Sequence, residues 1–335
     1  MLSYLMPAEW EPHEATWLSW PKDPETFPPG ILENVERTFA HMIGALKHDE
    51  KVNVLVNDAA WEKKAASKLA DNGIDLKNIF FHHIKSVDVW TRDYAPIFVK
   101  DDNGKITAVK WTFNAWGDKY EELKKDDYAG EQIAKSLNLP LAKPGIVLEG
   151  GSIDVNGKGI LLTSEQCLLN TNRNPHLGKK QIEGYLKDYL GAERVIWLGK
   201  GVEGDDTDGH VDDIARFVNK DTVVCASEEN ENDENYTALK DNLTILEDAG
   251  LKVIPLPMPG RIEFEGRRLP ASYANFYIAN KVVLVPVFGH ENDEKALEIL
   301  RKCFPERNVI SIRCESLVYG FGAIHCSTMQ QPAQK

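Results

Sequence analysis

A hairpin pattern that recurs four times constrains the fold of this chain more than any other feature of its sequence. In each copy two β-favouring runs flank a short polar turn, and the turns lie at Asn103, Asn156, Asn219 and Asn280. The first two turns are Asn-Gly dipeptides, the strongest short-range signal of a β-hairpin. The turns are 53, 63 and 61 residues apart, and this long, nearly constant spacing predicts a repeated structural unit.

Each hairpin is followed by a helical pattern and then by a single strand. After the third hairpin, residues 233–249 place leucines on one face of a helix, and residues 253–255 are strand-like. After the fourth, residues 293–304 and 309–312 repeat this order. The sequence therefore predicts a unit of strand, strand, helix and strand.

The two ends of the chain supply the parts of one more unit. The first strand and helix would combine with a last strand at residues 323–327, so that about five units form a closed ring without open sheet edges. No segment has the composition of a linker. We therefore predict an α/β fold, a five-bladed α/β propeller around a pseudo-fivefold axis, as a single domain over residues 1–335.

Composition places the chain among globular proteins and narrows its partners. Of 335 residues, 42% are hydrophobic, yet no apolar run approaches the roughly 18 residues of a membrane helix. The N-terminus lacks the features of a signal peptide, and the five cysteines lack metal or redox spacing, so we expect reduced thiols in the cytoplasm. A net charge of −13 is expected to repel nucleic acid and anionic membranes and to favour a small cationic substrate. The sequence leaves open whether the chain forms a homo-oligomer.

Residues with acid, base or nucleophile chemistry stand at the start of the units. They are Asp93, Glu149, His210 with Asp212, and Cys326 near the chain end. If the units surround an axis, equivalent positions meet at its centre, so these side chains are expected to converge. On a strand, His210 and Asp212 would share a face, whereas His325 would point away from Cys326. His210 is therefore the expected base for Cys326.

This combination of side chains favours one kind of substrate. Carboxylates accept hydrogen bonds, and they bind a planar, cationic guanidinium group in bidentate fashion. The implied reaction is attack of the Cys326 thiolate on the guanidinium carbon. His210 would protonate the departing ammonia and then activate the water that hydrolyses the covalent thiouronium.

Each of these residues, taken alone, has a simpler interpretation. Cys326 could be a small core residue, and Glu149 could be a solvated acid beside a turn. His210 and Asp212 could be a structural pair or half of a metal site. A metal would need further ligands at suitable spacing, which the sequence does not contain, so we predict no metal.

Five motifs resemble the agmatine deiminase (agmatine iminohydrolase) family, which includes bacterial-type peptidylarginine deiminases. They are found in order along nearly the whole chain, at residues 6–13 (MPAEWEPH), 90–93 (WTRD), 149–151 (EGG), 207–212 (TDGHVD) and 324–326 (IHC) with 330–332 (QQP). The resemblance implies the five-bladed α/β propeller of the guanidine-modifying (pentein) superfamily. It also implies that no metal or organic cofactor is needed.

The resemblance assigns roles to the matching positions. It implies that Cys326 is the nucleophile and His210 the general acid and base, and that Asp93 and Asp212 clamp the guanidinium. Glu149 would hold His210, and Trp90 would form a wall of the substrate channel. Three departures from the family pattern, Asp206, Phe321 and Ala323, are expected to lie near the tail of the substrate.

The identity of that tail separates the candidate functions. Agmatine, which would give N-carbamoylputrescine and ammonia, needs an acid for its amine, and Asp206, Asp208 and Glu9 are candidates. Peptidyl or free arginine, which would give citrulline, needs a cation for its carboxylate, and Arg173 and Arg261 are candidates. A propeller that binds a guanidino or polyamine ligand without turnover is the non-enzyme alternative, and the pairing of Cys326 with His210 argues against it.

Overall fold

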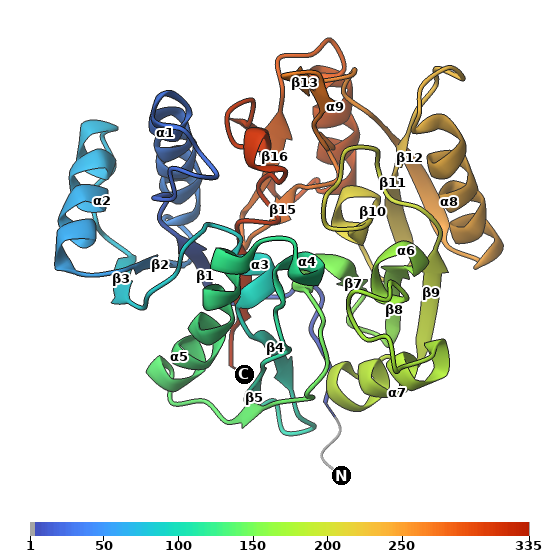
Figure 1. The fold of residues 1–335 in the computed structure, drawn as a ribbon, viewed down its shortest axis with the longest axis horizontal. Helices are drawn as coiled ribbons and strands as arrows, with labels where there is room; N and C mark the ends of the chain where they lie inside the picture. Colours follow the sequence, from blue (N-terminus) through green and yellow to red (C-terminus); the bar gives the residue numbers. More distant parts are fainter. Residues whose placement is uncertain (1–3, 335) are drawn as a thin grey trace.

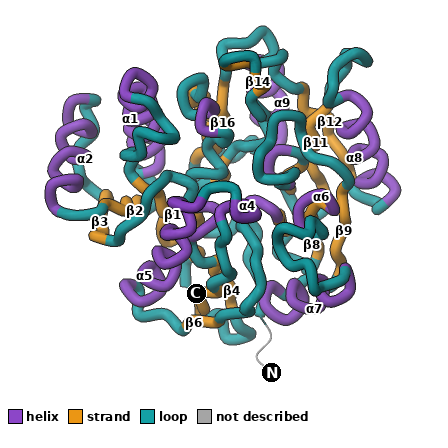
Figure 2. Tube along the Cα trace, in the orientation of Figure 1, coloured by secondary structure: helices purple, strands orange, loops and turns teal. Residues whose placement is uncertain are grey.

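Five sheets of similar design make up most of the molecule. The computed structural model describes residues 4–334, and Figure 1 shows the longer helices on the outside, with the strands between them. The same arrangement is visible in the secondary-structure colouring of Figure 2. The four predicted hairpins are confirmed. They are β4 (Ile97–Lys100) with β5 (Ile106–Val109), β7 (Ile153–Val155) with β8 (Ile160–Ser164), β10 (Ala215–Phe217) with β11 (Thr222–Ser227), and β15 (Tyr277–Ile278) with β16 (Val282–Val287).

A third strand completes each of these sheets after a helical crossover. It runs parallel to the second strand of its hairpin, as expected when a helix separates two neighbouring strands. These third strands are β6 (Leu141–Ala142), β9 (Arg194–Leu198), β12 (Lys252–Pro257) and β17 (Asn308–Arg313). The main crossover helices are α5 (Ala129–Ser136), α7 (Lys179–Leu190), α8 (Tyr236–Asp248) and α9 (Asp293–Cys303).

The fifth sheet joins the two ends of the chain. β18 (Met329–Pro332) lies antiparallel to β1 (His13–Ser19), and β1 is parallel to β2 (Lys51–Val56) across α1 (Pro29–Leu46). The same order of strands is thus built from both termini, as the sequence predicted. α2 (Ala59–Asp71) and β3 (Ile79–His83) extend this sheet, and Asp58 caps α2 by accepting from the amides of Ala60 and Trp61.

Two local predictions are wrong. The closing strand is β18 and not residues 323–327, most of which form a turn that contains Cys326. His210 and Asp212 do not lie on a strand either, because residues Val211–Asp213 form the 3₁₀-helix η3 and His210 precedes it. The alternation of side chains along a strand therefore does not apply to these residues, and their directions follow from turn geometry.

Several short elements surround the starts of the hairpins. They are α3 (Thr91–Tyr94), α4 (Ala115–Asp118), η1 (Glu121–Tyr128), η2 (Gly150–Ser152), α6 (Glu165–Leu168) and η4 (Val318–Gly320). A separate hairpin of β13 (Glu263–Phe264) and β14 (Arg267–Arg268) precedes the last sheet. Within residues 4–334, no helix is long and apolar enough to cross a membrane.

Candidate active site

A cavity of about 920 Å³ opens among the short elements that precede the hairpins. Cys326, Asp93, Trp90 and Asp206 line it, together with residues of the β13–β14 hairpin. His210, Asp212 and Glu149 are almost completely buried and do not line it. Contacts described below connect these three residues to Asp93 and Cys326, so the structure brings together the five side chains that the sequence expected to converge.

Cys326 is held by Asn275, a residue that the sequence argument did not single out. Asn275 Nδ2 donates to the Cys326 sulfur at 3.1 Å, and Asn275 Oδ1 accepts from the amides of Cys326 and His325. The sulfur lies 3.7 Å from Asp212 Oδ2. Burial, followed by repulsion from Asp212, Asp213 and Asp93, raises the pKa of the Cys326 thiol well above its usual value. The free protein therefore holds a neutral thiol.

Asp93 on α3 is fixed by two donors from other segments. Its Oδ1 accepts from the amide of Gly151 at 2.9 Å, and its Oδ2 accepts from Trp116 Nε1 at 3.0 Å. Burial raises the pKa of Asp93 to about 6; the charge of His210 opposes this, and Asp212 and Glu149 add to it. The carboxylate can accept further hydrogen bonds, so a cation entering the cavity would meet an acceptor already in position.

Trp116 occupies strained backbone. Ala115, Trp116 and Asp118 all have φ between 53° and 63°, a left-handed conformation that costs a non-glycine residue roughly 1 kcal/mol or more. The strain turns the indole into the cavity wall, where it meets Asp93 and packs edge-on against Tyr120. No hydrophobic pattern in the sequence pointed to this residue.

His210 lies behind Asp93. Its Nδ1 is 3.9 Å from Asp93 Oδ1, and neither ring nitrogen has a hydrogen-bond partner within the described part of the chain. Burial by itself would lower the pKa of His210, but Asp93, Cys167 and Glu149 together raise it well above its usual value. The ring is therefore expected to carry a proton in the free protein at neutral pH.

Gly151 makes this close arrangement possible. A Cβ atom added to it would lie 2.6 Å from His210 Nδ1 and 3.0 Å from carboxylate oxygens of both Asp93 and Asp212. Any side chain would therefore separate the three functional groups. The glycines after Glu149 allow this close approach, and the simpler interpretation of this motif as an ordinary turn does not account for it.

Glu149 is a buried partner of an arginine and not a solvent-exposed acid. Its Oε1 accepts from Arg173 Nε at 2.7 Å, and both side chains are fully buried. Arg173 also donates to Asp208 Oδ2 at 2.6 Å and to the carbonyl of Thr207 at 2.8 Å. Arg173 and Asp208 do not line the cavity, so these contacts argue against both as ligands for the tail of a substrate.

Asp212 is supported by a chain of charged groups. His325 Nδ1 lies 2.7 Å from Asp212 Oδ2, and His325 Nε2 lies 2.9 Å from Glu9 Oε2. Burial would raise the pKa of Asp212, but its hydrogen bond to His325 and the nearby positive charges keep it below the usual value. Glu9 also pairs with Arg216 at 2.9 Å. Glu9 is thus a buried support outside the cavity, which argues against it as the acid for a substrate amine.

The outer part of the cavity has a different composition. Asp206 Oδ2 accepts from Tyr120 Oη at 2.5 Å, and burial raises the pKa of Asp206 to about 6. Arg267 lies 4.0 Å over the ring of Phe321, whose φ of 65° is left-handed. Phe264 packs against Tyr319 across the same opening. Arg261, the other arginine considered for a substrate carboxylate, instead pairs with Glu234 and Glu263 and does not line the cavity.

Trp90 forms part of the inner wall. It packs against Phe27, and a Cβ atom added to Gly322 would lie only 2.5 Å from its indole ring. The glycine before Ala323 therefore lets the indole approach the segment that carries Cys326. Trp90 thus lines the cavity beside Cys326, and its role as the wall of a substrate channel stays a prediction.

Among residues 4–334, two clusters have the residue types that could bind a metal ion. One is Glu149, Cys167 and His210, and the other is Asp212, Asp213 and Cys326; in each the potential ligand atoms lie within 4.8 Å of one another. In the first cluster the Arg173 guanidinium already occupies one oxygen of Glu149. In the second, Cys326 lines the cavity, and Asp212 and Asp213 are buried beside it. The chemistry that we propose uses Glu149, His210, Asp212 and Cys326 without a metal ion at either cluster.

Known proteins share this fold and this order of motifs. Residues 5–332 match the family model of the Porphyromonas-type peptidyl-arginine deiminase. A putative agmatine deiminase of Legionella pneumophila is 37% identical over 98% of this chain and 95% of its own length. The agmatine deiminase of Stutzerimonas stutzeri is 38% identical over 98% of this chain and 96% of its own length.

Solved structures agree with these sequence matches. The substrate-bound C. jejuni agmatine deiminase is 33% identical, with a TM-score of 0.91 over 99% of this chain and 97% of that one. More distant likeness extends to the SxtG amidinotransferase of Microseira wollei, at 12% identity, a TM-score of 0.56 and coverage of 100% of this chain and 98% of that one. That likeness concerns the fold alone and relates it to the pentein fold. On the family match and the close relatives together, the chain belongs to the Porphyromonas-type peptidyl-arginine deiminase family.

Proposed function

We propose that this chain hydrolyses agmatine to N-carbamoylputrescine and ammonia through a covalent intermediate on Cys326. The observation that carries the proposal is the position of Cys326, which lines a cavity beside Asp93 and lies 3.7 Å from Asp212. A thiol among carboxylates is poorly suited to an acyl substrate, whose developing oxyanion needs donors. It suits a planar cation, and the 37–38% identical agmatine deiminases support that substrate class.

Binding and activation of the thiol form the first stage of the proposed reaction. Asp93 and Asp212 hold the guanidinium and place its carbon next to the Cys326 sulfur. The substrate cation and the His210 imidazolium both favour the thiolate, so the thiol proton leaves to water when substrate is bound. Loss of this proton converts a protected thiol into a nucleophile only when its target is present.

Bond exchange follows in two halves. The thiolate adds to the guanidinium carbon, and a C–S bond forms. His210 gives its proton to one terminal nitrogen, ammonia departs and a thiouronium cation remains on Cys326. The neutral ring of His210 then takes a proton from water as the oxygen adds to the carbon. The C–S bond breaks, and the urea group of the product and the thiol are released.

Asp206 is the proposed acceptor for the amine of agmatine. Of the three acids considered for this role, Asp206 lines the cavity, whereas Asp208 and Glu9 do not. Its carboxylate is held by Tyr120 at 2.5 Å and so points in a fixed direction. We assign the role of nucleophile to Cys326 and that of general acid and base to His210. Asp93 and Asp212 clamp the guanidinium, and Glu149 holds His210.

Free arginine, or a peptide that ends in arginine, is a second candidate substrate. The observation in its favour is Arg267, a cation on the rim of the same cavity that could pair with a carboxylate. Agmatine has no carboxylate that could pair with the guanidinium of Arg267. The family also includes peptidyl-arginine deiminases, which keeps this alternative open.

We also propose the overall setting of this site. The five sheets would form the blades of one closed α/β propeller, a single domain over residues 1–335 with the cavity near its axis. The support is the strand order common to all five sheets and the pairing of β18 with β1. From the five free cysteines we propose a cytoplasmic location, and from the absence of ligand spacing in the sequence we propose that no metal or organic cofactor takes part.

Ammonia release tests the function directly. Agmatine, free arginine and a peptide ending in arginine would each be supplied to the wild-type protein at equal concentration. We expect turnover of agmatine and much slower turnover of the other two. Release from arginine alone would assign the second candidate, and no release from any of them would favour a guanidino- or polyamine-binding protein.

A further inference from the structure

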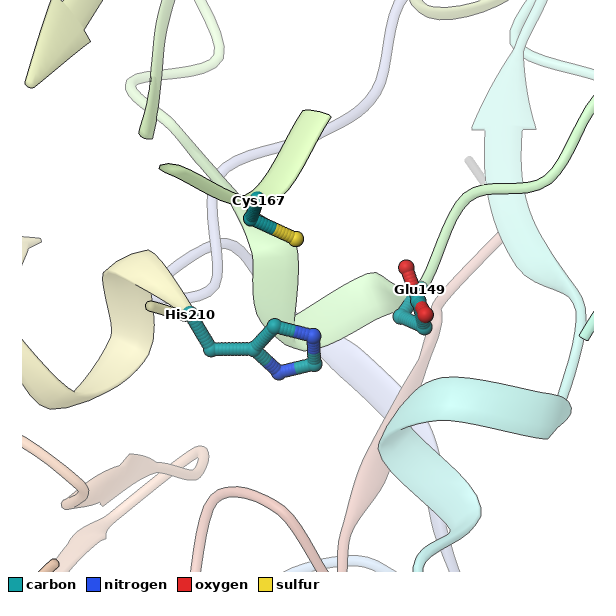
Figure 3. A group of neighbouring side chains, drawn as sticks. All are labelled: Glu149, Cys167 and His210. Carbon is teal, nitrogen blue, oxygen red and sulfur yellow. The ribbon is translucent and has the colours of Figure 1, made fainter. Parts of the chain in front are cut away.

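A second cysteine, Cys167, lies behind the proposed general acid His210, on the side away from the cavity. Cys167 is fully buried on the short helix α6, and Figure 3 shows its sulfur pointing toward the space between His210 and Glu149. The sulfur, a ring nitrogen of His210 and a carboxylate oxygen of Glu149 lie within 4.8 Å of one another. The chemistry described above makes no use of this thiol.

The backbone fixes Cys167 relative to His210. Ser164 caps α6, and its hydroxyl accepts from the amide of Cys167 at 3.1 Å. The same hydroxyl donates to the carbonyl of Gly209 at 2.5 Å, and Gly209 directly precedes His210. One serine therefore ties the helix that carries the thiol to the turn that carries the imidazole.

The imidazole of His210 faces two different environments. Its Nδ1 lies on the side of Asp93, which lines the cavity, whereas Figure 3 shows the other nitrogen directed toward Cys167 and Glu149. Among residues 4–334, neither nitrogen has a hydrogen-bond partner, and Glu149 Oε2 has none either. A buried polar group without a partner costs about 1–3 kcal/mol, so small movements that bring these groups together are favourable.

The Cys167 side chain is suited to act beside His210 as an uncharged thiol. Burial raises the pKa of Cys167, although His210 and Arg173 oppose the shift, so the group stays a thiol. A thiol can accept weakly from an N–H group and donate weakly to a carboxylate. The Arg173 guanidinium beside Glu149 already supplies the local positive charge, which argues against a metal cation at the same three residues.

We propose that Cys167 is a positioning residue for His210: a small movement would bring its thiol and the unpaired oxygen of Glu149 into hydrogen-bonding contact with the inner ring nitrogen and hold the ring there. With that nitrogen held, the outer one stays directed at the cavity. His210 must act first as an acid and then as a base, and its ring is neutral between the two steps. A held ring keeps its direction through this change. The kinetic part of this inference rests on the proposed function.

Two substitutions test the role in turnover of agmatine. Cys167→Ala removes the sulfur and is expected to lower kcat about 10- to 100-fold, the usual loss when a reacting group is misplaced, with less than a twofold change in KM. Cys167→Ser keeps a donor and an acceptor and is expected to recover most of the lost kcat. An alanine variant with wild-type kcat would overturn the proposal.

A second readout does not depend on turnover. The charged and titratable groups that act on the His210 ring are Asp93 from α3, Glu149 from the segment before η2, Cys167 from α6, and Asp212 and Asp213 from η3 directly after it. Cys167→Ala leaves the other groups in place and removes one acceptor, the sulfur, from the surroundings of the His210 ring. The midpoint of the His210 titration, followed by NMR of the ring nitrogens, is therefore expected at lower pH in this variant, with proton affinity reduced about threefold or more. An unchanged midpoint would contradict the proposal.

Cys225→Ala is the matched control. Cys225 is as completely buried, on β11, and its thiol also has a raised pKa caused by burial, but it packs in a separate apolar cluster. Its alanine variant is expected to lower Tm by a similar amount while leaving kcat and the His210 titration unchanged. If Cys225→Ala altered both in the same way, the effect would be one of packing. If the wild type turned over no agmatine, the proposed function would fail, whereas the NMR comparison would still decide the role of Cys167.

Discussion

The inner and outer ends of the cavity are built on different principles. At the inner end, Asp93 and Cys326 are held by donors from segments far away in the sequence, and His210, Asp212 and Glu149 are buried directly behind them. At the outer end, Arg267 is exposed and rests on one aromatic ring, on a hairpin of two short strands.

We infer from this difference that the inner end carries out the reaction and the outer end selects the substrate. Moving any inner group requires the movement of several buried neighbours, so the geometry around the guanidinium is rigid. Arg267 at the outer end is exposed, so its substitution changes the charge that meets the tail with little effect on the core. We therefore expect inner substitutions to change kcat by orders of magnitude and outer ones to change mainly KM.

Cys326→Ala should have the largest effect. Without the sulfur no covalent intermediate forms, and loss of a nucleophile costs roughly 10⁴-fold or more in kcat. Cys314→Ala is the control, because Cys314 is also fully buried but does not line the cavity. Ammonia release measures both variants, and mass spectrometry of wild-type protein quenched during turnover should detect the adduct. Substantial turnover by Cys326→Ala would sink the covalent mechanism.

Asp93→Asn should have the second largest effect. The amide keeps the size of the carboxylate but loses its charge at the position where we propose that the guanidinium binds. We expect kcat/KM for agmatine to fall about 10²- to 10³-fold, comparable to the loss of one preorganised electrostatic group in other enzymes. Steady-state kinetics measures this change, and a loss below tenfold would show that the inner end is less dependent on charge than we argue.

Asp206→Asn should have a smaller effect, and mainly on KM. One ion pair with the substrate amine is lost, and about 1.4 kcal/mol of binding corresponds to a tenfold increase in KM. Asp208→Asn is a control for nearby charge, since Asp208 already pairs with Lys119 and Arg173. An Asp206→Asn variant with unchanged KM and reduced kcat would place this residue at the inner end instead.

The pH dependence of kcat/KM can distinguish the two ends further. The pKa values of Asp93 and Asp206 are both raised to about 6, so in the free protein both become protonated as the pH falls through about 6. Since both must be charged to bind a dication, kcat/KM should fall steeply on this acid side, with a slope near two. In Asp206→Asn the slope should approach one, and an unchanged slope would exclude Asp206 as the second group.

The sequence predicted the inner end better than the outer end, and for a physical reason. The five inner residues occupy equivalent places at the starts of the repeated units, so the symmetry of the repeat alone suggested that they meet. They are Asp93, Glu149, His210, Asp212 and Cys326. Which way each side chain points was not predictable, because η3 and the turn before β18 replace the expected strands. The expectation that His325 points away from Cys326 rested on a strand that does not form, and the ring of His325 contacts Asp212.

No pattern in the sequence pointed to the other residues that support the site. Trp116 reaches Asp93 through left-handed backbone, and Asn275 reaches Cys326 through amide contacts that no periodic pattern encodes. Arg267 lies in a two-stranded hairpin outside the repeat. Its approach to Phe321 joins residues 54 positions apart in the chain. Each of these depends on tertiary contacts of loops, for which composition and spacing carry little information.

Arg267→Gln should have the smallest effect, and its direction is informative. Arg267 lines the cavity near Asp206 and repels the amine of agmatine, so its removal should lower KM for agmatine. Because the guanidinium is exposed and screened by salt, we expect a change of only about two- to threefold, which should disappear at high ionic strength. The same substitution should raise KM for any substrate that carries a carboxylate.

The control for this experiment is Arg261→Gln, an equal change of charge on the same side of the protein. Arg261 is exposed, pairs with Glu234 and Glu263, and does not line the cavity, so KM should stay within error of the wild type. If both variants lowered KM equally, the cause would be the net charge of the protein and not the outer end of the cavity. If Arg267→Gln alone lost activity on arginine while gaining affinity for agmatine, this single side chain would account for the choice between the two tails.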